Sequence, residues 1–200
     1  MGGYDISHST ETLSRHYLLP KEVVQQLIAI GQHKAAETPL WKTIFGSFMA
    51  GFYVTFGGMA AITAAGGLEH DFAAAYPAVP KILTGLTFWI ALLLIMSLGG
   101  ELFTGNLMYI SLARLHGRCT TLQMLTNWLI VFWGNFAACV FGSYVLAYKG
   151  DLYVSEPWRS YVQTVAMHKV EMSWGAVVSR GIGANWMVCA VSRKPSTRPS

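Results

Sequence analysis

The sequence has few charged residues and few cysteines. Only 12% of its 200 residues are charged, against about 25% in soluble domains. The net charge of +4 is spread along the chain, which excludes the basic face of a nucleic-acid-binding protein. The three cysteines, Cys119, Cys139 and Cys189, form no CxxC pair, which excludes a disulfide scaffold or a zinc site. The chain has no paired acids and no nucleophile beside a base, so we expect no enzyme and no cofactor.

Apolar residues dominate the sequence. They make up 53% of the chain, and the mean hydropathy is +0.40. Residues 44–65 carry no charge, and about 20 such residues are what a helix needs to cross a bilayer. Other apolar segments cover residues 82–98, 125–148 and 173–191. We therefore predict an all-α, multi-pass integral membrane protein whose transmembrane domain covers residues 44–191 of the chain.

The first forty residues are polar and mixed in charge, so we expect an N-terminal tail over residues 1–19 and no cleavable signal peptide. Pro20 suits the first turn of a helix, and apolar residues then recur at helical spacing until Pro39. The other positions of this segment are polar. We therefore predict an amphipathic helix over residues 20–38 that lies at the membrane surface.

The second apolar segment is interrupted. It stops after residue 98 and resumes over 107–115, so the backbone has to leave the helix at roughly mid-membrane depth. Two explanations stay open at this point: a kink for packing, or the broken helix by which transporters place an ion site. An acid at such a depth faces the protein interior, and a structural acid that accepts the freed amides is the interpretation we favour for Glu101. The residues expected to shape the break are Gly99, Gly100, Glu101, Gly105 and Asn106.

The distribution of Lys and Arg indicates the orientation of the chain. With a cytoplasmic N-terminus, nine of these residues fall on the inside and four on the outside, as the positive-inside rule requires. We therefore expect a plasma-membrane protein whose N-terminus is cytoplasmic.

A set of motifs resembles the formate/nitrite transporter family. The string Gly-Glu-Leu-Phe-Thr-Gly-Asn at residues 100–106 follows Lys34 and Pro39-Leu40. Asn127-Trp128, Gly134-Asn135, His168-Lys169 and residues 184–189 then continue the similarity in the order of the family. The resemblance implies an aquaporin-like helical bundle of two inverted three-span repeats, which assembles as a homopentamer with one pore in each subunit. It also implies the transport of small monovalent anions such as formate, nitrite, lactate, acetate and hydrosulfide.

The same resemblance implies functional positions in this sequence. Leu102, Phe103 and Thr104 match the cytoplasmic constriction, together with Leu92. Phe88 matches the outer constriction. The remaining matches are vestibule and pore positions, namely Lys34, Lys169 and Asn185. From spacing alone, Phe88 and Leu92 would be packing residues, Lys34 an interfacial lysine, and Thr104 a residue that bonds its own backbone.

These positions fit a physical mechanism. Lysines at both mouths would attract anions, whereas leucine and phenylalanine rings would form a dry barrier to charge. We therefore expect the anion to take up a proton before it crosses, so that protons are partners of the transport.

The sequence departs from the family after Val191. The resemblance would require a second broken helix with a central histidine and a further span, but residues 192–200 form a basic, proline-bearing tail. We therefore expect an incomplete transporter in which the broken-loop amides and Glu101 lack cover. The alternative is a non-transporting membrane fragment that associates with full-length subunits or has no function. Arg180 is an unexpected charge in the last apolar segment, and Glu101 is a conceivable partner for it.

Overall fold

The computed structural model describes residues 20–191, and every regular element within this range is helical. The all-α prediction is therefore confirmed. The predicted tails, residues 1–19 and 192–200, lie outside the described residues. The elements in chain order are α2 (Pro20–Gln32), the π-helical η1 (His33–Glu37), α3 (Leu40–Gly66), α4 (His70–Ala75), α5 (Ala78–Leu98), α6 (Phe103–Leu115), α7 (Thr121–Gly142), the π-helical η2 (Ser143–Tyr148), α8 (Trp158–Val170) and α9 (Trp174–Val191).

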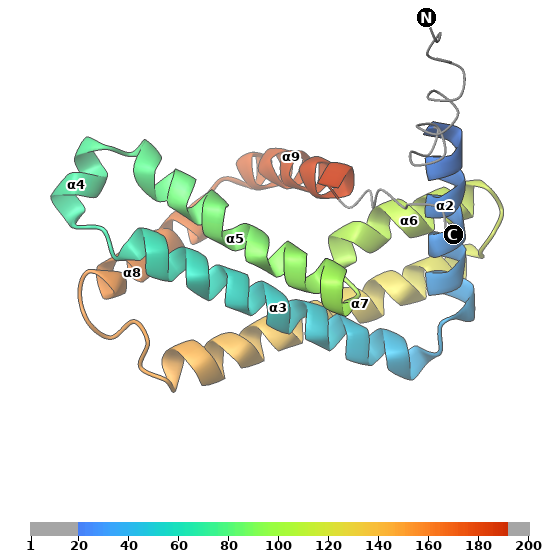
Figure 1. The fold of residues 1–200 in the computed structure, drawn as a ribbon, viewed down its shortest axis with the longest axis horizontal. Helices are drawn as coiled ribbons and strands as arrows, with labels where there is room; N and C mark the ends of the chain where they lie inside the picture. Colours follow the sequence, from blue (N-terminus) through green and yellow to red (C-terminus); the bar gives the residue numbers. More distant parts are fainter. Residues whose placement is uncertain (1–19, 192–200) are drawn as a thin grey trace, which may run out of the picture.

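Three long helices form the body of the molecule. Helix α3 lies between α5 and α7 and packs along both of them (Figure 1). Among the described residues, three helical segments are long and apolar enough to cross a membrane: α3, α5, and α7 continued by η2. Helix α9 occupies the predicted fourth span but does not reach that hydropathy among the described residues, and it contains Arg180 and Asn185.

The helices extend beyond the charge-free segments that the sequence defined. Helix α3 begins at Leu40 instead of residue 44, because the carbonyl of Pro39 already accepts the amides of Lys42 and Thr43 at 3.0 and 3.2 Å. Helix α5 similarly begins at Ala78 instead of residue 82. A lysine limits the apolar segment but not the helix, since its long side chain can reach the interface while its backbone stays helical.

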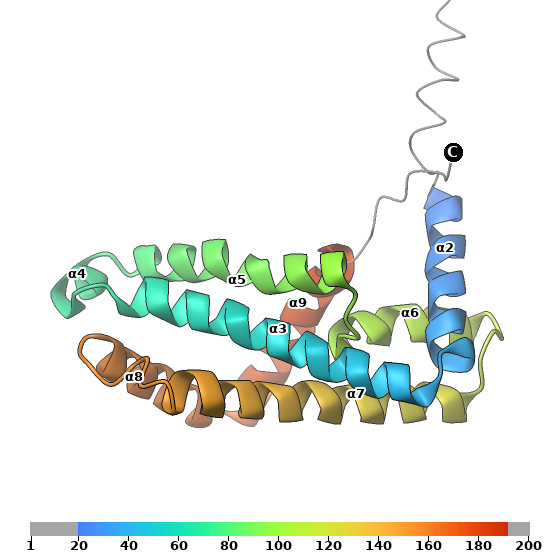
Figure 2. The same cartoon turned by 60° about the horizontal axis from the view of Figure 1, so that its bottom comes forward.

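Helix α2 runs across one end of the three long helices. Figure 2 shows it perpendicular to α3, α5 and α7. Its buried residues are Leu27 and Gly31, and its principal neighbour is α6. If the long helices follow the membrane normal, α2 lies in the membrane plane, which is the orientation expected for an amphipathic interfacial helix.

Small residues allow α3 to approach both neighbours closely. On α7, Gly134 packs against Ser47, and a Cβ atom at Gly142 would lie 3.0 Å from the Thr55 hydroxyl. On the other side of α3, a Cβ atom at Gly57 would lie 2.6 Å from Cβ of Ala91 in α5. Close backbone contact of this kind drives helix association in membranes.

Two adjacent glycines of α3 provide a matched test of this packing. We expect Gly57→Ala to lower the free energy of unfolding by about 1–3 kcal/mol, because the added methyl group overpacks the contact with Ala91. Gly58→Ala is the control: a Cβ atom there meets nothing within 4 Å, and alanine is a better helix former than glycine by about 1 kcal/mol. Thermal unfolding in detergent measures both variants. Equal stability of the two variants would contradict the packing argument.

Candidate functional site

The chain leaves the helix for only four residues between α5 and α6, namely Gly99–Leu102. Gly99 has φ 78°, a conformation that favours glycine. Gly100 faces α3, where a Cβ atom would lie 3.0 Å from that of Ala50. Gly105 and Asn106 were expected in the break but lie in the first turn of α6, together with Phe103 and Thr104.

Hydrogen bonds from α7 and α3 explain this early start of α6. The Asn135 side chain of α7 accepts the amide of Phe103 at 2.9 Å, and it donates to the carbonyls of Ser47 at 2.7 Å and Glu101 at 2.9 Å. It therefore supplies the cap that Leu102, the residue before the helix, cannot provide.

The amides of the first three residues of the break also have partners within this chain. The amides of Gly99 and Gly100 both donate to the carbonyl of Ile95 at 3.1 Å, and the amide of Glu101 donates to the carbonyl of Gly46 at 3.0 Å. We expected the amides of the break and Glu101 to lack partners in this chain, and this expectation is therefore wrong. The assignment of the Glu101 carboxylate to loop amides is also wrong, because side chains occupy its oxygens.

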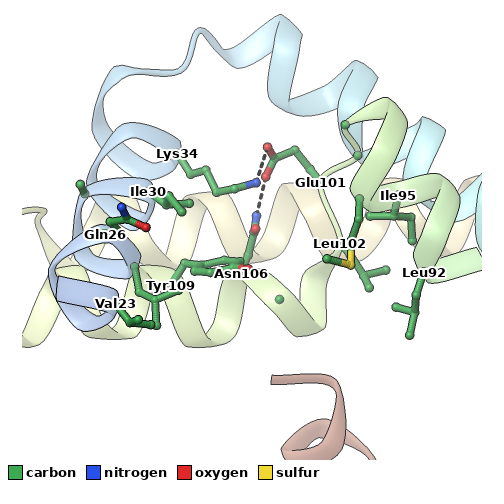
Figure 3. Close-up of a pocket in the computed structure, with 16 residues that line it drawn as sticks. Val23, Gln26, Ile30, Lys34, Leu92, Ile95, Glu101, Leu102, Asn106 and Tyr109 are labelled. Atoms are coloured by element: carbon green, nitrogen blue, oxygen red, sulfur yellow. Dashed lines mark hydrogen bonds and ion pairs between the residues drawn. The ribbon is translucent and has the colours of Figure 1, made fainter. Parts of the chain in front are cut away.

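We call this group of side chains, Lys34, Glu101, Asn106 and Asn127, the Lys34 cluster. The Lys34 ammonium lies 2.6 Å from Oε1 of Glu101, and the Asn106 side-chain amide donates to Oε2 at 2.8 Å (Figure 3). Asn106 also donates to the side-chain carbonyl of Asn127 at 3.0 Å, and Asn127 donates to the backbone carbonyl of Lys34 at 3.3 Å. The Lys34 and Glu101 side chains are each 18% exposed. The cluster joins η1, the break, α6 and α7.

The partner of Glu101 is therefore Lys34 and not Arg180. The Arg180 guanidinium lies 2.9 Å from the sulfur of Met172. An acid and a base 67 residues apart neutralise each other next to the broken helix, where an unpaired charge would be costly.

A cavity of about 640 Å³ adjoins the Lys34 cluster. Residues of α2, the end of α5, the break and the start of α6 line it (Figure 3). One part of its wall is polar, with Lys34 and Glu101, and another part is apolar, with Leu92 and Leu102. The structure therefore brings Lys34, Leu92 and Leu102 around one space, although they come from three separate segments of the chain.

Comparison with known proteins now identifies the family. A family model described as formate/nitrite transporter matches residues 21–193. The chain belongs to the formate/nitrite transporter family. It is 33% identical over 185 residues to a probable formate transporter of Methanothermobacter thermautotrophicus, covering 85% of this chain and 66% of that protein. It is 29% identical over 170 residues to a formate channel of Bacillus thuringiensis, covering 85% of this chain and 63% of that protein.

A solved structure of a formate/nitrite transporter family ion channel agrees with the fold. It superposes with a TM-score of 0.74 at 28% identity, over 84% of this chain and 66% of that one. The present chain thus spans less than two thirds of the two sequence relatives. These relatives are transporters and channels, which agrees with the prediction of a non-enzymatic integral membrane protein.

The other predicted positions of this family member lie away from the cavity lining. Phe88 is 40% exposed on α5, and the Phe103 ring packs edge-on against Phe132 of α7 at 5.4 Å between centroids. Lys169 is exposed near the end of α8. Helix α8 lies toward the end of the bundle opposite α2 (Figure 2).

Thr104 and Asn185 lie on two helices that pack together, α6 and α9. The thiol of Cys189 lies 3.7 Å from the carbonyl of Thr104. The Thr104 hydroxyl and the Asn185 side-chain carbonyl are both buried without a hydrogen-bond partner in the described part of the chain. Such atoms are rare in folded proteins. Both oxygens are therefore free to form a hydrogen bond with a polar ligand.

Sequence reasoning missed the roles of two asparagines in α7, Asn127 and Asn135. Both were noted only as part of the family resemblance. An amide in an apolar span needs a hydrogen-bond partner, so their presence in an uncharged segment was the available signal. The sequence does not indicate which partner each would find.

Proposed function

We propose that this protein transports small monovalent anions of weak acids, such as formate, nitrite, lactate, acetate or hydrosulfide, through one pore in each subunit. The observation that carries the proposal is the cavity at the broken helix, whose wall combines the charged Lys34 cluster with Leu92 and Leu102. Membership in the formate/nitrite transporter family supports the substrate class.

In this mechanism, Lys169 attracts the anion at one mouth by its charge, whereas Lys34, whose charge Glu101 balances, binds the anion at the other mouth by hydrogen bonding. Lys34 keeps donors available, since an ammonium group has three hydrogens and the hydrogen bond to Glu101 uses one of them. Leu92, Leu102 and Phe103 form the apolar cytoplasmic constriction in this proposal, and Phe88 forms the outer one. A bare anion is heavily penalised there, so the anion takes up a proton and crosses as the neutral acid.

Thr104 and Asn185 provide polar contacts for the neutral acid in this proposal. Their unpartnered buried oxygens are able to bond the carboxyl group of a passing acid without a charge. Transport is then coupled to protons, since each acid that crosses brings one proton with it.

We also propose that the end of the bundle at α2 faces the cytoplasm. Within residues 20–191, that end holds five lysine and arginine residues, whereas the opposite end holds four. This difference follows the positive-inside rule. The full protein is proposed to be a homopentamer in the plasma membrane, and exposed aromatic residues on the sides of the bundle, such as Phe48 and Trp133, support lateral contact.

Uptake of labelled formate at two pH values tests this function. Cells or vesicles that contain the chain are compared with those that lack it. We expect uptake to rise by up to about tenfold for each pH unit of acidification, since the neutral fraction of a weak acid rises in that proportion above its pKa. The substitutions Lys34→Ala, Lys169→Ala and Thr104→Ala should each lower the rate.

Two outcomes would count against these proposals. Uptake equal to the control, with the chain present in the membrane, would favour the non-transporting fragment instead. Unchanged uptake in all three alanine variants would remove the roles proposed for those side chains.

A further inference from the structure

A second groove lies between the start of α3 and the α2–η1 segment. We call it the α3 groove, and its volume is about 540 Å³. Five of its lining residues also line the cavity, namely Ala29, Ile30, Lys34, Gly99 and Glu101, and the other six line the groove but not the cavity. The residues that matter below are Ile30, His33, Trp41, Lys42 and Phe45.

Among the described residues, the charges around the α3 groove are paired except at one lysine. Glu101 pairs with Lys34. Glu37 lies 3.0 Å from Nδ1 of His33, and this contact, with a hydrogen bond from Gln32, lowers the pKa of the Glu37 carboxyl.

Lys42 is the uncompensated cation. No carboxylate of the described residues lies within ion-pair distance of its ammonium group, which instead sits over the Trp41 ring, 5.5 Å from the centroid. The α3 groove therefore offers one unbalanced positive charge.

The remaining features of the α3 groove are those of a bilayer interface. Trp41 is 65% exposed and Phe45 is 63% exposed. They lie in the first turns of a helix that is apolar enough to span the membrane, at the end where α2 runs perpendicular to it (Figure 2). Tryptophan at such a position anchors a protein at the level of the lipid headgroups, and lysines near that level attract anionic lipids.

We propose that the α3 groove binds one anionic phospholipid, with the phosphate at Lys42 and an acyl chain along Phe45 and Ile30. The phosphate supplies the charge that Lys42 lacks. The acyl chain covers exposed aromatic and aliphatic surface that a soluble anion would leave uncovered. This site shares Ile30 with the transport cavity, but Lys42 and Phe45 are not part of the cavity lining.

Lipid retention by the purified chain tests the proposal. The chain in detergent is titrated with phosphatidylglycerol or with phosphatidylcholine of the same acyl chains, and bound lipid is counted by native mass spectrometry. We expect a preference of about fivefold for phosphatidylglycerol, from about 1 kcal/mol for each lysine near an anionic headgroup. Lys42→Gln should abolish that preference.

Lys149→Gln is the matched control. Lys149 also lies over aromatic rings, 5.7 Å from the Tyr144 centroid and 6.0 Å from that of Tyr148, but it is not part of the α3 groove. Its replacement should leave the preference unchanged. Phe45→Ala provides a second, uncharged test, and it should weaken the retention of both lipids.

Several results would overturn the proposal. One is equal retention of the two lipids by the parent chain. Another is an equal loss of preference in Lys42→Gln and Lys149→Gln, which would indicate that anionic lipid is attracted by the overall charge of the protein and not bound in the α3 groove. Full displacement of the lipid by glycerol phosphate would show that the groove binds a soluble anion.

Discussion

Asn135→Leu should lower the free energy of unfolding by about 3–5 kcal/mol. Asn135 bonds three backbone groups at once, and two of them, the amide of Phe103 and the carbonyl of Glu101, lie at the break, whereas the third, the carbonyl of Ser47, lies inside helix α3. Leucine has a similar volume but makes none of these bonds, and each buried backbone group left unpaired costs about 1–3 kcal/mol. Thermal or denaturant unfolding in detergent measures the change.

Phe136→Leu is the control for this variant. Phe136 is the next residue of α7 and is 54% exposed, so its replacement tests the helix without touching the break. We expect hydrogen exchange at residues 99–103 to accelerate in Asn135→Leu alone, because the break loses its support from α7. If both variants have the same free energy of unfolding, the hydrogen bonds of Asn135 do not stabilise the break.

Glu101→Gln is expected to lower the free energy of unfolding by about 2 kcal/mol. It leaves the ammonium of Lys34, which is 18% exposed, without its countercharge. Removal of one partner from a fully buried pair costs about 3–5 kcal/mol, and the remaining exposure of this pair reduces the cost. The same unfolding experiment measures it, and hydrogen exchange over residues 33–38 should report a loosened η1.

A double-variant cycle separates the ion pair from other effects. Lys34→Met removes the ammonium group that Glu101→Gln leaves unpaired. The double variant should therefore lose about 1–2 kcal/mol less free energy of unfolding than the two single variants lose in sum. Strictly additive effects would show that the two side chains do not stabilise each other.

The break could be located from the sequence because two glycines and an acid interrupt an otherwise apolar segment. Its extent could not be predicted. Gly105 and Asn106 looked like loop residues because both are poor helix formers, but α6 starts before them. The cap that allows this start comes from Asn135, which is 32 residues farther along the chain than Phe103.

The sequence by itself determined the membrane class, the helical fold and the family, since hydropathy and ordered motifs are local properties of the chain. Only the tertiary structure decided that Lys34 neutralises Glu101, that Asn135 supports the break and that Lys42 remains without a countercharge among the described residues. These relations depend on which helices lie side by side. Because hydrogen bonds and ion pairs act over a few ångströms between residues far apart in the sequence, spacing along the chain does not determine them.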